Sequence, residues 1–294
     1  MKDSNNDFSN FCLGTAQFGM NYGLDNLKDT KIKNKEIEDI FNFFFINKGM
    51  YIDTAQNYGD SEKIISKYLS KDSKVITKFK FDDGMSIEEV ATKSLMNLNI
   101  PLLDTVLIHN SEALVGGRSA LDQLIKLKDQ KFTKNIGISI YSLKDIWGSS
   151  IDFGKEILSC IDVLQIQGNA FDKSFFDEEN LKDINKDIRI DMRSIFLQGV
   201  LLQDISILNS MFPKFYKELN LWETYCKQNS LPKLNAALLN LPNHNRLNSL
   251  TLFGCRSLKE IQEIKYTIES IDELDSLKFS SDFPKELIDP RLWK

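Results

Sequence analysis

The chain is poor in the residues that hold metals and disulfides. Its 294 residues include only two histidines, His109 and His244, and four scattered cysteines without a CxxC pair. Cysteines this sparse in a long chain form neither a disulfide framework nor a structural zinc site. Two histidines also leave little basis for a polyhistidine metal centre. We therefore expect a reduced protein that works without a metal.

The chain also lacks an excess of basic charge and any long apolar run. Lys and Arg number 37 against 42 Asp and Glu, which gives a net charge of −5. This balance argues against nucleic acid or an anionic membrane as the main partner. The first residues are polar, unlike a signal peptide, and the apolar run 40–46 is far shorter than the roughly 20 residues of a membrane span. We expect a cytoplasmic protein that acts on a small molecule, and the sequence indicates no oligomeric state.

The sequence does show a regular alternation of apolar and amphipathic segments. Hydrophobic residues make up 42% of it, enough for a large core. The expected strands are 11–14, 50–53, 74–78, 105–109, 135–139, 162–165, 188–193 and 250–254. Helical patterns lie between them, for example at 34–47, 61–69, 86–98, 119–130 and 257–268. Eight such pairs, with no Pro-, Gly- or Ser-rich linker, predict a (β/α)8 TIM barrel that forms one domain over residues 1–294.

A doubly wound open sheet is the alternative arrangement of the same segments. Such a sheet usually places a GxGxxG phosphate loop after its first strand. Residues 14–19 read GTAQFG, which does not fit that pattern. The barrel is therefore favoured.

Several of the expected strands stop at an ionisable or hydrogen-bonding residue. These strand-end residues are Asp53, Lys78, His109, Ser139 and Gln165. Each alone has an ordinary explanation as a helix cap, a solvated charge or a structural polar group. In a barrel, however, all these strand ends meet at one rim, where neighbouring strands lie about 4.8 Å apart. We therefore expect the five side chains to form one site.

Tyr58 completes this constellation, five residues after Asp53. A free phenol has a pKa of about 10 and is a poor acid at neutral pH. A neighbouring Lys78 ammonium is expected to lower that pKa, with Asp53 holding the ammonium charged and oriented. His109 is expected to donate a hydrogen bond to an incoming carbonyl oxygen. The residues thus predict a proton-donor site for a group that becomes an alkoxide.

Segment 53–62, DTAQNYGDSE, resembles the signature loop of the aldo-keto reductases. Their catalytic Asp, Tyr, Lys and His correspond in order to Asp53, Tyr58, Lys78 and His109. Further similar segments are 13–19, 136–139, 163–169, 193–199 and 253–257. The resemblance implies NAD(P)H-dependent reduction of an aldehyde or ketone, or the reverse oxidation, without a metal. It assigns Tyr58 as the general acid.

The resemblance also implies where the cofactor binds. Ser139 and Gln165 match positions that hold the nicotinamide carboxamide, and Arg193 stands where a tyrosine often stacks on the ring. At the adenosine end, the matching residues are Gly254, Arg256, Ser257 and Glu263. Because members of the family commonly use NADP(H), the resemblance favours NADP(H) over NAD(H). Glu260, however, stands where some members carry a phosphate-binding arginine, and an acid there suits a bare ribose hydroxyl better.

The substrate pocket is expected to be lined by both polar and aromatic side chains. Its candidate residues are Phe18, Tyr22, Gln56, Asn110 and Gln198. Such polar and aromatic side chains suit a hydroxylated, sugar-like carbonyl compound, and the GTAQFG and RSIFLQG segments resemble bacterial members linked to surface polysaccharides.

Two alternative functions stay open. One is a regulatory protein of the same fold that senses nicotinamide nucleotides without turnover, and the other is a metal-dependent barrel hydrolase.

Overall fold

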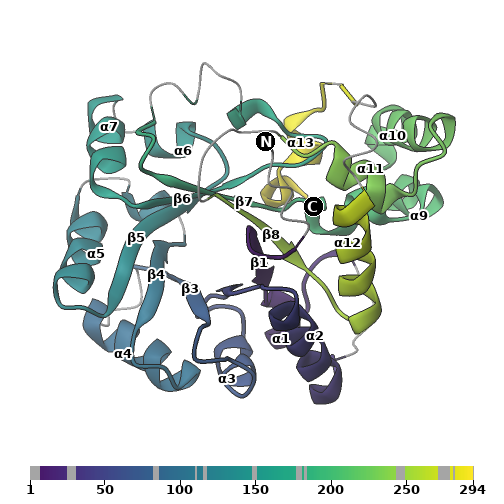
Figure 1. The fold of residues 1–294 in the computed structure, drawn as a ribbon. Helices are drawn as coiled ribbons and strands as arrows, with labels where there is room; N and C mark the ends of the chain where they lie inside the picture. The colour runs from purple at the N-terminus through teal and green to yellow at the C-terminus, as the bar shows by residue number, and fades with distance from the viewer. Residues whose placement is uncertain are drawn as a thin grey trace, which may run out of the picture.

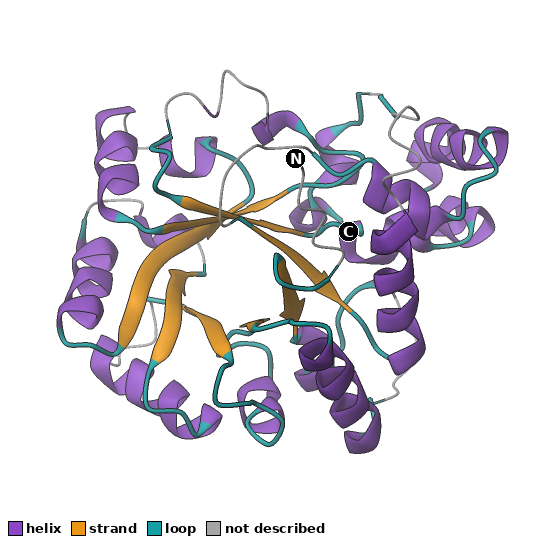
Figure 2. Cartoon of the chain, in the orientation of Figure 1, coloured by secondary structure: helices purple, strands orange, loops and turns teal. Residues whose placement is uncertain are grey.

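Eight parallel strands form a closed barrel in the computed structural model (Figures 1 and 2). The structure describes residues 7–24, 31–81, 86–109, 111–114, 118–147, 151–176, 181, 184–242, 249–270, 279–280 and 282–293. The strands are β1 (Phe11–Gly14), β2 (Tyr51–Asp53), β3 (Lys74–Phe79), β4 (Leu103–Ile108), β5 (Thr133–Ile140), β6 (Val163–Gln167), β7 (Arg189–Arg193) and β8 (Leu250–Gly254). They pair in chain order, and β1 pairs with both β2 and β8. The predicted single-domain barrel is confirmed, and the open sheet is excluded.

Helices surround the strands, as a parallel sheet requires (Figure 2). The α-helices are α1 (Ala16–Gly19), α2 (Asn34–Ile46), α3 (Ser61–Ile65), α4 (Ile87–Leu98), α5 (Ser119–Asp129), α6 (Lys144–Trp147), α7 (Ile151–Cys160), α9 (Ile205–Met211), α10 (Tyr216–Gln228), α11 (Lys233–Leu239), α12 (Leu258–Ser270) and α13 (Lys285–Ile288). Short 3-10 helices are η2 (Ser111–Leu114), η3 (Ser174–Phe176), η4 (Leu197–Leu202), η5 (Pro213–Phe215) and η7 (Pro290–Leu292). Within the described ranges, no helix is long and apolar enough to cross a membrane.

Local chemistry explains where the helices begin and end. At the start of α4, the Ser86 hydroxyl accepts a hydrogen bond from the Glu89 N–H, and the Glu89 carboxylate accepts one from the Ser86 N–H. This reciprocal capping satisfies two N–H groups that the helix itself cannot bond. The helix ends at Asn99, which adopts a left-handed conformation with φ of 53°.

The buried apolar side chains of the described residues form three clusters. A small one fills the inside of the barrel and includes Cys12, Leu107 and Val163. The largest lies between the strands and the surrounding helices. A third cluster, built around Trp222, lies beneath α9, α10 and α11, which gather on one side of the barrel near α13 (Figure 1). The Trp222 indole N–H donates to the Leu201 carbonyl at 3.0 Å, which ties α10 to η4.

Candidate active site

The carboxyl ends of consecutive strands bring the predicted rim residues together. Asp53 is the last residue of β2, Lys78 lies one residue before the end of β3, and His109 directly follows β4. Ser139 of β5 is in register with Gln165 of β6. Because all the strands run in the same direction, these side chains meet at one end of the barrel.

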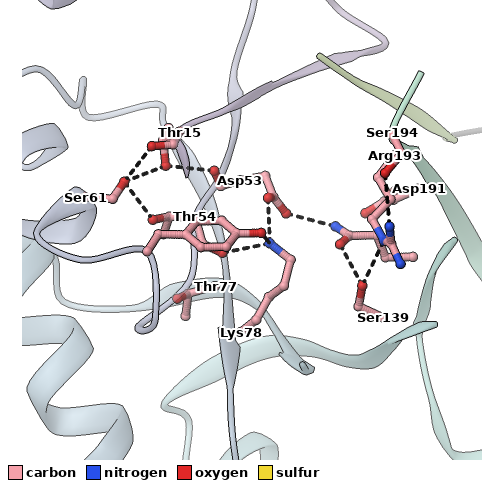
Figure 3. Close-up of polar contacts among 12 residues, drawn as sticks. Thr15, Asp53, Thr54, Ser61, Thr77, Lys78, Ser139, Asp191, Arg193 and Ser194 are labelled. Atoms are coloured by element: carbon pink, nitrogen blue, oxygen red, sulfur yellow. Dashed lines mark hydrogen bonds and ion pairs between the residues drawn. The ribbon is translucent and has the colours of Figure 1, made fainter. Parts of the chain in front are cut away.

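Lys78 lies at the centre of this group (Figure 3). Its Nζ is 2.5 Å from Asp53 Oδ1 and donates to the Thr54 carbonyl at 2.9 Å. The same Nζ is 3.4 Å from the Tyr58 hydroxyl oxygen. The Lys78 and Asp53 side chains are only 2% and 6% exposed. A buried ammonium is thus held between a carboxylate and a phenol.

The surroundings of Tyr58 shift its pKa in the direction opposite to the sequence expectation. Burial raises the pKa of Tyr58 above its ordinary value, and the negative charge of Asp53 adds to this, while Arg193 opposes it. The expected lowering by Lys78 does not prevail, because Asp53 lies beside that ammonium and neutralises much of its effect. Tyr58 therefore keeps its phenolic proton at neutral pH.

His109 is a neutral imidazole at physiological pH. Burial lowers its pKa to about 3, and the charges of Lys78 and Arg193 contribute in the same direction. Its ring meets the Tyr58 ring edge-on, with centroids 5.7 Å apart. No group in the described part of the chain bonds its buried Nδ1. A neutral imidazole has one N–H donor and one acceptor nitrogen, so His109 can donate a hydrogen bond without carrying charge.

Gln165 forms an internal hydrogen-bonded chain that the sequence did not predict. Its Nε2 donates to Asp53 Oδ2 at 2.8 Å, and its Oε1 accepts from the Ser139 hydroxyl at 3.0 Å. Arg193 Nε in turn donates to Ser139 Oγ at 3.2 Å. Figure 3 shows this chain running across the rim from Arg193 to Lys78. Gln165 thereby fixes the second oxygen of Asp53, and both ends of its amide have a protein partner.

The loop that carries Tyr58 is held by buried hydroxyl groups and close backbone contacts. Ser61 Oγ donates to Thr15, and the Thr54 hydroxyl donates to Ser61 (Figure 3). Gly59 has φ of +57°, and a Cβ added there would lie 2.3 Å from the Gly19 carbonyl oxygen. Only glycine allows both this conformation and this approach. The loops after β1 and β2 therefore support each other beneath Tyr58.

Glu62 anchors the same loop from below. Its buried carboxylate accepts hydrogen bonds from Thr77 Oγ1 at 2.9 Å, Ser94 Oγ at 2.8 Å and Asn97 Nδ2 at 3.1 Å. These donors come from β3 and α4, whereas Glu62 belongs to α3. The carboxylate thus ties three elements together.

We expect Glu62→Ala to lower the free energy of unfolding by about 2–4 kcal/mol, because three buried or half-buried donors lose their acceptor. Urea denaturation followed by circular dichroism measures the change. Glu38→Ala is the matched control, since the Glu38 carboxylate is 49% exposed and pairs with Lys35 on the surface. An equal loss in both variants would contradict the anchoring role of Glu62.

Two cavities meet beside Tyr58. The first, of about 420 Å³, extends from Tyr58 to the end of β8 at Gly254. The second, of about 380 Å³, lies above Lys78 and His109. The residues that line both are Tyr22, Tyr58, Gln165, Arg193 and Gln198. Reactants placed in the two cavities would therefore meet beside Tyr58.

Some residues predicted for the substrate pocket lie elsewhere. The Gln56 side chain donates hydrogen bonds to the Val90 carbonyl at 2.8 Å and to Ser94 Oγ at 3.0 Å, so it holds the loop after β2 against α4. Phe18 is buried in the main core. Tyr22 and Gln198 line both cavities as expected. Asn110 and His244 lie outside the described residues.

The second cavity contains two residues that sequence reasoning missed. The Tyr141 ring lies between two guanidinium groups, with Arg193 Cζ 4.1 Å and Arg291 Cζ 4.0 Å from its centroid. All three residues line the cavity. Arg291 reaches it from η7 near the end of the chain, and nothing in the local sequence pattern around position 291 indicates this contact.

Comparison with protein-family models shows the family of the chain. A model of the aldo/keto reductase family matches residues 10–278. The chain belongs to the aldo-keto reductase family. Its members are NAD(P)-dependent oxidoreductases that act on carbonyl groups and the corresponding alcohols. The resemblance drawn from segment 53–62 is thereby confirmed.

Solved structures of aldo-keto reductases share the fold at low sequence identity. AKR11C1 from Bacillus halodurans, in its holo form, is 17% identical with a TM-score of 0.63, and the alignment covers 95% of each chain. PA4992 from Pseudomonas aeruginosa, assigned as an aldo-keto reductase, is 14% identical with a TM-score of 0.61, over 90% of this chain and 92% of that one. At such identities the likeness speaks for the fold alone. No curated protein matches the sequence at a significant level.

In this aldo-keto reductase, acidic residues lie at the end of β8, where α12 begins. The Glu36 carboxylate accepts a hydrogen bond from the Leu258 N–H at 2.5 Å. The Glu260 carboxylate accepts one from the Arg256 N–H at 2.7 Å, and the Glu260 N–H donates to Ser257 Oγ at 3.2 Å. Backbone donors at the start of the helix are therefore already bound to two carboxylates.

The residues predicted for the adenosine end are only partly brought together. Gly254 and Arg256 line the first cavity, together with Glu260. Ser257 and Glu263 are not among the residues that line it. Glu263 Oε1 lies 3.6 Å from the Lys259 ammonium on the exposed side of α12. In the described part of the chain, no group of three or more His, Cys, Asp or Glu residues could hold a metal ion.

Proposed function

We propose that this chain reduces an aldehyde or ketone with NAD(P)H, with Tyr58 as the general acid. The observation that carries the proposal is the Lys78 ammonium, which lies between Asp53 at 2.5 Å and the Tyr58 hydroxyl at 3.4 Å. This group lies where the two cavities meet. A proton donor supported by a buried cation suits a reaction in which a carbonyl oxygen gains negative charge.

The first cavity fits a nicotinamide dinucleotide. Its volume of about 420 Å³ is typical of a small-molecule site, and it ends at the backbone of Gly14 and Gly254. A Cβ added at Gly254 would lie 2.4 Å from Gln17 Oε1, so glycine allows the Gln17 side chain to lie against the backbone at this end. When bound, the reduced nicotinamide supplies a hydride to the carbonyl carbon. Arg256 is the residue we assign to the phosphate-bearing part of the cofactor.

The four proposed catalytic residues, which are Asp53, Tyr58, Lys78 and His109, have distinct tasks in this proposal. Tyr58 transfers its phenolic proton to the carbonyl oxygen, and the Lys78 ammonium stabilises the phenolate that remains. Asp53 keeps Lys78 protonated and fixed in place. Neutral His109 donates a hydrogen bond that orients the oxygen toward Tyr58. Because the site is buried, these electrostatic effects are stronger than they would be in water.

A polar second cavity favours a hydroxylated substrate. Asn57, Tyr141 and Gln198 line it, and each offers hydrogen-bonding groups. We therefore retain a sugar-like carbonyl compound as the proposed substrate class.

Turnover of a carbonyl panel tests the proposed function. The purified chain is mixed with NADH or NADPH and with aliphatic, aromatic and hydroxylated aldehydes, and the loss of reduced-nicotinamide absorbance is followed. Saturable oxidation of the cofactor supports the reductase. Tight cofactor binding without turnover of any carbonyl or alcohol would instead favour the regulatory alternative. Absence of cofactor binding would contradict both.

For the cofactor, we propose a preference for NAD(H), contrary to the expectation from family habit. The carboxylates of Glu36 and Glu260 already accept hydrogen bonds at the start of α12, from Leu258 and Arg256. A 2′-phosphate there would compete for the same donors and be repelled by the two negative charges. A ribose hydroxyl meets neither obstacle.

Fluorescence titration is expected to give a dissociation constant for NADPH at least about tenfold higher than that for NADH, which corresponds to about 1.4 kcal/mol. The double variant Glu36→Gln/Glu260→Gln is expected to bring the dissociation constants for NADPH and NADH closer together, because it removes both negative charges. Glu263→Gln is the matched control, since Glu263 lies on α12 but not in the cavity. Tighter binding of NADPH by the wild type would refute the preference.

A further inference from the structure

Arg193 is held rigidly between the two cavities by neutral partners. Its Nε donates to Ser139 Oγ at 3.2 Å, its Nη1 to Ser194 Oγ at 3.1 Å, and its Nη2 to the Ile140 carbonyl at 2.9 Å. Its guanidinium also stacks on the Tyr141 ring at 4.1 Å. Of its five N–H donors, three are used in these bonds, which leaves two. The side chain is thus fixed in position but not fully bonded.

The other two cations of the second cavity are already neutralised. Lys78 pairs with Asp53 at 2.5 Å. Arg291 forms a two-point contact with the Asp289 carboxylate, at 2.9 Å from Nε and 2.8 Å from Nη2. In the described part of the chain, Arg193 contacts no carboxylate. Half-buried charges in proteins are usually paired, so a cation without a partner in a cavity indicates a missing anion.

The position of the Arg193 charge in the second cavity indicates which bound molecule carries the anion. The positive charge of Arg193 acts on the pKa of both Tyr58 and His109, so it lies close to the groups assigned to the carbonyl oxygen. Its stacking partner Tyr141 lines the second cavity and not the first. The acidic residue Glu112 also lines the second cavity, and its side chain is exposed to solvent. Among the cations that line the second cavity, Arg193 is therefore the one that contacts no carboxylate in the described part of the chain.

We propose that the substrate carries a carboxylate and that Arg193 binds it in the second cavity. The inference rests on the proposed function, because it assumes that Tyr58 and His109 hold the carbonyl oxygen. A planar guanidinium with free N–H groups matches a carboxylate in shape and charge. The substrate class is thus an oxo acid or an aldehyde acid, and hydroxyl groups on it would meet Asn57 and Gln198.

Matched substrates test this without altering the protein. 4-Carboxybenzaldehyde and its methyl ester have the same reacting aldehyde and differ in the charge at the far end. We expect kcat/KM for the acid to exceed that for the ester by about 10- to 100-fold, with most of the difference in KM. Succinic semialdehyde against butanal provides an aliphatic pair. Equal or better use of the uncharged member in both pairs would overturn the inference.

Variants then identify the residue responsible. Arg193→Gln is expected to lower the acid-to-ester ratio about 10- to 100-fold, and Arg193→Lys is expected to restore part of it. Arg291→Gln is the matched control, because Asp289 already neutralises that cation, and it should change the ratio by less than about threefold. A ratio that falls equally in both variants would contradict the assignment to Arg193.

A binding measurement separates this inference from the proposed reaction. Isothermal titration of the cofactor-bound protein with 4-(hydroxymethyl)benzoate and with its methyl ester requires no turnover. We expect the carboxylate to bind more tightly in the wild type and the difference to disappear in Arg193→Gln. Turnover of carbonyl compounds without any preference for anions would refute only the carboxylate site. Absence of all turnover, together with anion binding through Arg193, would refute only the reductase.

Discussion

Tyr58→Phe is expected to lower kcat about 10²- to 10⁴-fold while the cofactor still binds. The substitution removes only the hydroxyl group, so the ring can keep its contact with His109. The Lys78 ammonium remains paired with Asp53, which leaves the site electrostatics largely intact. What is lost is the proton that neutralises the developing alkoxide. Steady-state kinetics with a saturating aldehyde and a fluorescence titration with NADH measure the two effects separately.

Tyr22→Phe is the matched control for this experiment. Tyr22 lines both cavities, as Tyr58 does, but the tyrosine hydroxyl within hydrogen-bonding distance of Lys78 is that of Tyr58. We expect Tyr22→Phe to lower kcat less than about tenfold, as loss of a binding contact would. Near wild-type kcat in Tyr58→Phe would remove the general-acid assignment. Comparable losses of kcat in both variants would show that the Tyr58 hydroxyl contributes a binding contact and not the transferred proton.

The barrel and its rim residues could be predicted because they depend on local patterns. The segments 11–14 and 250–254 coincide with β1 and β8, since apolar runs bounded by polar residues mark buried strands. β4 begins at Leu103, before the predicted start at 105, because the polar Asp104 interrupts the apolar pattern. Once strands are placed, parallel pairing brings Asp53 and Lys78 to the same end without further information.

Contacts between distant segments could not be predicted in this way. The stacking of Tyr141 between Arg193 and Arg291 depends on how the end of the chain returns to the rim. The pKa of Tyr58 depends on burial, which a strand pattern does not reveal and which is the largest cause of its rise. Sequence patterns therefore predicted that these side chains lie together at the rim, but not the environment that sets their pKa values.

The buried Lys78–Asp53 ion pair is expected to contribute to the free energy of unfolding as well as to turnover. Lys78→Met leaves the Asp53 carboxylate buried, with the Gln165 amide as its remaining side-chain partner. An uncompensated buried charge costs about 3–5 kcal/mol, so the free energy of unfolding should fall by that amount. Turnover should also fall, because the phenolate of Tyr58 loses its stabilising cation. Denaturant unfolding of the wild type and the variant measures the first effect.

Two further variants show whether charge, and not packing, causes this loss. Asp53→Asn added to Lys78→Met removes the orphaned charge but keeps an oxygen that can accept from Gln165. The double variant should therefore recover about 1–3 kcal/mol of stability relative to Lys78→Met, while turnover stays low. Lys63→Met, at an ammonium that is 66% exposed, should leave the unfolding midpoint nearly unchanged. A double variant no more stable than Lys78→Met would mean that lost packing dominates, because neutralising Asp53 would then have relieved nothing.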